Sequence, residues 1–216
     1  IPFPRMTYDE SMAKYGSDKP DLRFGLEIRE ITDIVAGSTS DMLKGAAAKG
    51  GAFAIGSAEG AALSRKQVDA LEDAAKKLGA AGLARGKLAA DGTSSGIFRF
   101  FDEESQKKLR EMFGLDSDGL VLIVAGQREP SLKSLGAVRL KLAETCGLVP
   151  RDEFRFVWIT EFPLFEWDPA LDAWTPIICS ACLLRPTWNT LRAIRAVCAQ
   201  GSTILPSTGW SSAREA

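Results

Sequence analysis

Apolar residues recur at helical spacing in four segments of the chain. The clearest helix is expected over residues 64–78, where Ser64 and Gln67 form a capping box and Gly79 ends the helix. Its apolar stripe consists of Val68, Leu71, Ala75 and Leu78. The other expected helices span residues 8–15, 103–113 and 130–145.

Short apolar runs bounded by turn residues predict the strands. A buried strand is expected over residues 120–125, directly after the turn at Asp118-Gly119. Shorter strands are expected at residues 53–55, 82–84 and 97–100. From residue 35 to residue 127 the expected order is therefore strand, helix, strand, strand, helix, strand. This order is typical of ferredoxin-like α+β domains.

The stretch between Glu153 and Trp174 is rich in aromatic residues and is expected to nucleate the largest core. Aromatic and β-branched residues alternate there, so both faces of an extended chain would be apolar. The alternating residues are Phe154, Phe156 and Trp158 on one face and Val157 and Ile159 on the other. This pattern predicts a strand buried in the middle of a sheet. The turn-forming residues 168–172 predict that a hairpin follows.

Composition narrows the functional classes. The 216 residues carry a net charge of −1 and include no histidine, the commonest acid–base residue and metal ligand near neutral pH. Any contact with nucleic acid therefore needs a local basic patch, and triad hydrolases and zinc enzymes are disfavoured. No apolar run approaches the roughly 18 residues of a membrane helix. We expect a cytoplasmic protein, and the first residue, Ile1, suggests a piece of a longer one.

A loop over residues 15–23 concentrates charge among turn-forming residues. One interpretation is a solvated turn held by its own side-chain hydrogen bonds. The other is a loop that meets a phosphate or a substrate. The candidate residues for such a contact are Ser17, Asp18, Lys19 and Arg23.

Five motifs occur in the order that they have in one enzyme family. They are FPRMTY at residues 3–8, YGSDKPDLR at 15–23, GAAGL at 79–83, LGAVRL at 135–140 and VWITEFPLFE at 157–166. Together they resemble the middle of a bacterial-type aspartyl-tRNA synthetase over residues 1–176. The resemblance implies that residues 35–127 form the GAD insertion domain. The flanking residues 1–34 and 128–176 would then belong to one class II catalytic domain, built on an antiparallel sheet.

The same resemblance implies a two-step reaction. ATP, with Mg²⁺, and L-aspartate give aspartyl-adenylate, and the aspartyl group then passes to tRNA(Asp). The full-length family is homodimeric. The resemblance also implies that Ser17, Asp18, Lys19 and Arg23 form a loop close to substrate or tRNA. No catalytic residue or metal ligand is assigned, because the main ATP- and aspartate-binding motifs of the family are absent from these residues. We therefore expect a fragment that is inactive alone.

The alternative is a stand-alone tRNA-associated binding module, related to the insertion domain of tRNA-dependent amidotransferases. Its charge would come from Lys19, Arg23 and the basic residues of the helix at 64–78. A solvated charged face is the competing interpretation of that helix.

Residues 177–216 match nothing in the family and are expected to be disordered. A shifted reading frame takes the last base of each codon together with the first two bases of the next codon. In that frame, the codons of Thr175–Leu183 can encode a small residue followed by His-His-Met-Phe-Ser-Met-Pro, which resembles the family's continuation. We therefore hypothesise that this tail is frameshifted. Three of the four cysteines lie in it, and Cys179 and Cys182 form a CxxC without a second pair or a histidine, so no metal site is expected.

Overall fold

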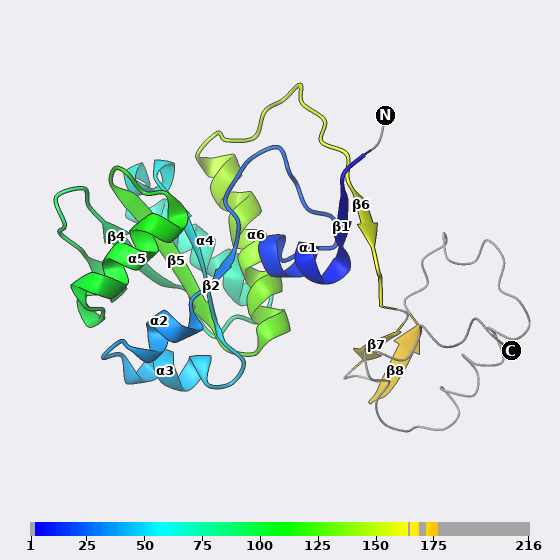
Figure 1. Cartoon of the computed structure of the whole chain (residues 1–216), viewed down its shortest axis with the longest axis horizontal. Helices are drawn as coiled ribbons and strands as arrows, with labels where there is room; N and C mark the ends of the chain where they lie inside the picture. The colour runs from blue at the N-terminus through cyan, green and yellow to red at the C-terminus, as the bar shows by residue number, and fades with distance from the viewer. Residues whose placement is uncertain (1–2, 164, 169–171, 177–216) are drawn as a thin grey trace, which may run out of the picture. The chain divides into compact units, whose positions relative to one another are not determined.

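The computed structural model describes residues 3–163, 165–168 and 172–176 (Figure 1). Residues 3–161 belong to one compact unit, and the strands that follow Phe162 belong to a second. Each unit is described by itself below.

A four-stranded antiparallel sheet lies at the centre of the first unit, counted over the described residues. Its strands are β2 (Arg29–Glu30), β3 (Ala52–Ser57), β4 (Ala84–Leu88) and β5 (Gly119–Ala125), in the spatial order β2-β3-β5-β4. All six residues of β3 are buried, as are six of the seven in β5. The expected strand at residues 120–125 is confirmed.

Both faces of this sheet are covered, and alternate residues of the two central strands serve different cores. Phe53 and Ile55 of β3 point to the face packed by helices α4 (Arg65–Lys77) and α6 (Arg128–Thr145). Ala52 and Ala54 point to the opposite face. That face is packed by α2 (Thr32–Ala36), α3 (Asp41–Ala47) and α5 (Glu103–Phe113). Two covered faces explain why the central strands read as continuous apolar runs.

The helices predicted from caps and apolar stripes are all present. Thr7 caps the N-terminus of helix α1 (Tyr8–Tyr15), and its hydroxyl accepts a hydrogen bond from the Glu10 amide at 3.1 Å. The capping box of α4 is formed by Ser64 and Gln67. Asp102 caps the N-terminus of α5 and Gly114 caps its C-terminus. Helix α6 carries Pro130 in its first turn. Met112 of α5 is 38% exposed.

One expectation about the insertion region is wrong. Residues 97–100, expected as a strand, form the 3-10 helix η2 (Gly96–Phe100), and a second 3-10 helix, η1 (Glu59–Ala62), follows β3. The Phe98 side chain is fully buried over Gly86 of β4, where a Cβ atom would lie 2.5 Å from the ring. This turn of 3-10 helix places the Phe98 ring in the core. The small-residue stretch at residues 35–51 contains α3.

The expected buried strand at residues 154–162 is also wrong. Strand β6 covers only Trp158–Thr160 and pairs in parallel with β1 (Arg5–Thr7), with Met6 opposite Ile159. Phe154, Phe156 and Trp158 are 79%, 61% and 60% exposed. The alternation is that of a strand, but among the described residues no further strand or layer covers these rings.

The second unit contains an antiparallel hairpin. It consists of β7 (Phe165–Asp168) and β8 (Ala173–Pro176), with Phe165 opposite Pro176. This confirms the hairpin expected around residues 168–172. The expectations for residues 177–216, including the CxxC pair, fall outside the described residues. Within the described part, none of the helices is both long and apolar enough to cross a bilayer.

Candidate functional site

The charged loop starts where helix α1 meets helix α6. Gly16 ends α1 in a left-handed conformation, with φ of 65°. A Cβ atom on Gly136 of α6 would lie 2.7 Å from the Gly16 carbonyl oxygen and 2.8 Å from that of Tyr15. The two backbones therefore touch, and this contact brings the first residues of the loop against the middle of α6.

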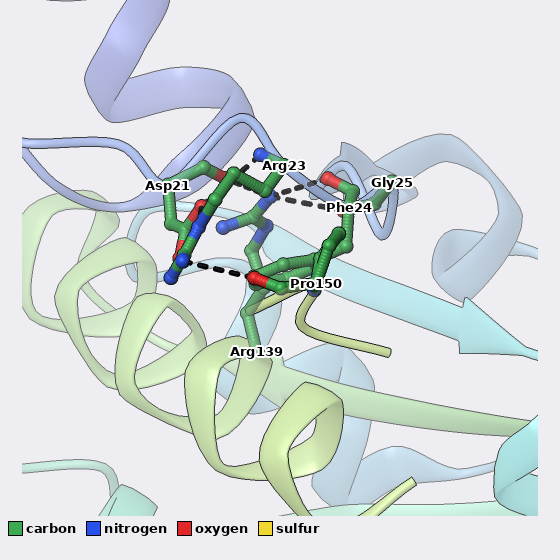
Figure 2. Close-up of polar contacts among 6 residues, drawn as sticks. All are labelled: Asp21, Arg23, Phe24, Gly25, Arg139 and Pro150. Atoms are coloured by element: carbon green, nitrogen blue, oxygen red, sulfur yellow. Dashed lines mark hydrogen bonds and ion pairs between the residues drawn. The ribbon is translucent and has the colours of Figure 1, made fainter. Parts of the chain in front are cut away.

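One buried arginine of α6 holds the far end of the loop. Arg139 is 1% exposed, and its guanidinium donates hydrogen bonds to four backbone carbonyls. Figure 2 shows the contacts with Asp21, Phe24 and Gly25. Nε donates to Leu26 O at 2.9 Å, and Nη2 donates to the carbonyls of Asp21, Phe24 and Gly25 at 2.7, 3.1 and 2.9 Å. These four acceptors all lie within residues 21–26.

Aromatic rings lie over the same guanidinium. The Arg139 carbon Cζ is 4.8 Å from the centre of the Tyr15 ring and 4.2 Å from that of Phe24, within the range of cation–π contacts. Burial lowers the pKa of Arg139, while Tyr15, Asp21 and Glu27 act in the opposite direction. Burial also raises the pKa of Tyr15, whose hydroxyl donates to Glu27 at 3.4 Å.

A second arginine links the loop to the chain that follows α6. Arg23 donates from Nε and Nη2 to the Asp21 carboxylate at 3.0 and 2.8 Å, and from Nη1 to the Pro150 carbonyl at 3.1 Å (Figure 2). The hydrogen bonds from Arg23 hold the pKa of Asp21 below its usual range. This pair ties the segment before the central sheet to the segment after it.

The four predicted site residues are thus placed differently. Arg23 is engaged at the base of the loop, and the Ser17 hydroxyl accepts a hydrogen bond from the Lys19 amide at 3.0 Å. Asp18 is half-buried and Lys19 is exposed. In the part of the chain that the structure describes, neither the Asp18 carboxylate nor the Lys19 ammonium has a hydrogen-bond or ion-pair partner. Lys19 is therefore the basic residue of this set whose charge is available to a ligand.

A shallow groove of about 250 Å³ lies beside the loop. Residues 20–23 form one wall and residues 153–156 the other. The Phe154 and Phe156 rings stack with centroids 6.3 Å apart. The centroid of the Phe3 ring lies 5.3 Å from that of the Phe156 ring. The groove carries two acidic and two basic side chains, so its formal charge is balanced.

Comparison with known proteins identifies the relatives. The family model described as "GAD domain" matches residues 43–135. The aspartate–tRNA(Asp/Asn) ligase of Bacillus subtilis (strain 168) is 45% identical over 171 residues, which is 78% of this chain and 29% of the relative. The aspartate–tRNA ligase of Clostridium botulinum (strain Loch Maree / Type A3) is 44% identical over 169 residues, again 78% of this chain and 28% of the relative. The chain is a relative of the bacterial aspartate–tRNA ligases.

The match is consistent with a central fragment of such a ligase, because the chain spans less than a third of the length of the curated relatives that it matches. The family resemblance inferred from the five motifs is confirmed.

Arg139 was not among the site residues predicted from the sequence. It lies on the apolar stripe of α6, four residues after Leu135 and three before Leu142, both fully buried. A charged residue at such a position is a usable signal, since arginine is rarely fully buried unless it is paired. The motif LGAVRL contains it, but the pattern alone does not show what its guanidinium contacts.

Proposed function

We propose that this chain is part of an aspartate–tRNA ligase that activates L-aspartate with ATP as aspartyl-adenylate and transfers the aspartyl group to tRNA(Asp). The observation that carries the proposal is the 45% identity to the B. subtilis ligase over 171 residues. Identity of this size over most of the described chain argues for a shared ancestor. The homodimeric state and cytoplasmic location of the full-length protein belong to the same proposal.

The domain arrangement is part of this proposal. Residues 35–127 would form the ferredoxin-like GAD insertion, and residues 1–34 and 128–176 would form pieces of one antiparallel-sheet catalytic domain. Two observations favour placing the two flanks in one domain. Strands β1 and β6 come from the two flanks and pair with each other, and the aromatic side chains beside β6 are exposed. In the whole ligase, further strands of the catalytic sheet would cover them.

The ligand-facing element that we propose is the loop at residues 17–23. Lys19, with its exposed ammonium, would contact a phosphate of the substrate or of tRNA, and Ser17 and Asp18 would lie beside that contact. Arg23, held by Asp21 and Pro150, would support the base of the loop. A lysine acts in such a role as a point charge.

Across the described residues, no group of three acidic, histidine or cysteine side chains is arranged to hold a metal ion. Together with the missing ATP- and aspartate-binding motifs, this leads us to expect no activation of aspartate by these 216 residues alone. Aspartate-dependent exchange of pyrophosphate into ATP tests this: we expect no turnover above the background without aspartate. Turnover by the purified chain would overturn the assignment as an inactive fragment.

The alternative function is a stand-alone tRNA-binding module, with α4 as its basic surface. One contact reduces the positive charge of that surface, because Glu72 pairs with Lys76 at 2.7 Å. Titration of the chain with tRNA at several salt concentrations distinguishes the possibilities. A steep salt dependence that is lost in Lys66→Gln/Lys77→Gln but kept in Lys19→Gln would favour the module. Loss in Lys19→Gln alone would favour the loop.

A further inference from the structure

We infer that Arg139 is a positioning residue, which sets the backbone course of residues 21–26 and through it the place of Lys19 at the exposed turn of the loop. Lys19 matters for ligand contact only if the function proposed above is correct. The order of the loop does not depend on that function.

The first support is the choice of partners. A fully buried cation is normally paired with a carboxylate, because desolvating it alone is costly. In the described part of the chain no carboxylate forms an ion pair with Arg139. Its partners are four carbonyls of one six-residue stretch, which lies more than 110 positions earlier in the chain. The guanidinium therefore serves as a template around which this stretch is wrapped.

The second support is a strained residue at the end of the stretch. Leu26 has φ of 64°, a left-handed conformation that is unfavourable for a branched side chain. Its carbonyl accepts the Arg139 Nε hydrogen bond at 2.9 Å, and its side chain packs against the core. Strain of this kind persists only where the surroundings over-determine the conformation. Arg139 supplies the fixed donor geometry that keeps Leu26 in place.

The third support is that both ends of the loop meet at the same group. Tyr15 begins the loop at residues 15–23 and Phe24 directly follows it, and both rings lie over the Arg139 guanidinium. The Gly16–Gly136 backbone contact leaves no room for the loop to slide along α6. The two ends of residues 16–23 are therefore held close together, and Lys19 lies near the middle of this segment. A change in the position of these two ends would move Lys19.

A purely structural role for Arg139 makes a different prediction. If Arg139 only contributes to the core, its replacement lowers global stability, and the loop loosens no more than in any variant of equal stability. Leu142→Ala is the matched control, because Leu142 is fully buried on the same face of α6, one turn later, and makes none of the loop contacts. Arg139→Lys keeps the charge but lacks the planar set of donors.

The test is limited trypsin digestion of the full chain, following the cut after Arg23 by mass spectrometry. The Lys19-Pro20 bond is a poor trypsin site, so the Arg23-Phe24 bond reports on the loop. In Arg139→Lys we expect this cut to be at least about tenfold faster than in Leu142→Ala under conditions of equal global stability. In Phe24→Leu, which removes one ring from the guanidinium at a half-buried position, we expect a smaller increase.

Equal cutting rates in Arg139→Lys and Leu142→Ala would overturn the inference. If Arg139→Lys does not fold, Phe24→Leu and Tyr15→Leu decide, and parental rates in both would overturn it. Titration with tRNA(Asp) separates the two proposals. If the parent binds, we expect Arg139→Lys to weaken binding as much as Lys19→Gln. If the parent does not bind, ligand contact by the loop fails, while the digestion still decides the role of Arg139.

Discussion

Gly136 on helix α6 lies so close to Gly16 at the end of helix α1 that a Cβ atom on it would come within 2.7 Å of the Gly16 carbonyl oxygen. Both partners in this contact are backbone, so neither can move aside by changing a rotamer. The contact therefore sets the distance between the two helices and, through it, the position of the loop at residues 17–26.

Gly136→Ala is expected to destabilise the first unit by roughly 1–3 kcal/mol, the usual cost of overpacking a closed contact. Gly45→Ala is the matched control, since Gly45 also lies in a helix but its added Cβ would meet nothing within 4 Å. There the helix preference of alanine should stabilise by roughly 0.5–1 kcal/mol. Denaturant unfolding followed by circular dichroism measures both. Equal effects of the two substitutions would mean that the glycine contact is not tight.

The Arg23–Asp21 pair predicts how stability depends on pH. Its hydrogen bonds lower the pKa of Asp21 in the folded state, so between that lowered pKa and the ordinary value the unfolded state binds more protons. The stabilisation is complete above the ordinary carboxyl pKa of about 4 and is lost as the pH falls through the lowered value.

Asp21→Asn should flatten the acid limb of the curve of unfolding free energy against pH, leaving the curve above about pH 5 nearly parallel to that of the parent. Arg23→Gln should flatten the same limb, because it removes the donor that lowers the Asp21 pKa. The double variant should be no flatter than either single variant. Additive flattening in the double variant would show that the two residues act independently.

The coding DNA tests the origin of residues 177–216. If the tail is frameshifted, the shifted frame from about Thr175 continues with the His-His-Met-Phe-Ser-Met-Pro segment and then with further ligase sequence. The same comparison predicts that the match to the relatives extends past 78% of the chain once the frame is restored. A shifted frame that meets an early stop codon or encodes unrelated residues contradicts the hypothesis.

Local signals predicted the helices well, because their causes are local. Thr7, Ser64 and Asp102 each cap a helix through an amide three residues later, so both the cap and its partner can be seen in a short window of sequence. The buried strand β5 was predictable for a similar reason, since a run apolar at every position suits a strand covered on both faces.

The errors occurred where distant parts of the chain decide the outcome. Phe156 and Trp158 alternate as strand residues do, but whether such a strand is buried depends on neighbours that its own sequence does not specify. Phe98 lies in a short apolar run that suits a strand or a helical turn equally, and its packing over Gly86 selects the turn. Arg139 could be flagged from its place on an apolar stripe. The convergence of four carbonyls on it could not, since any residue can supply a carbonyl.

The central claim is that these residues are a working segment of an aspartate–tRNA ligase, and a chimera tests it most directly. In the B. subtilis ligase, the 171 aligned residues are replaced by the corresponding residues of this chain. The chimera is checked for folding by circular dichroism and assayed for aspartylation of tRNA(Asp). We predict that it charges the tRNA with aspartate, dependent on ATP. A folded chimera that does not charge tRNA(Asp) would contradict the claim.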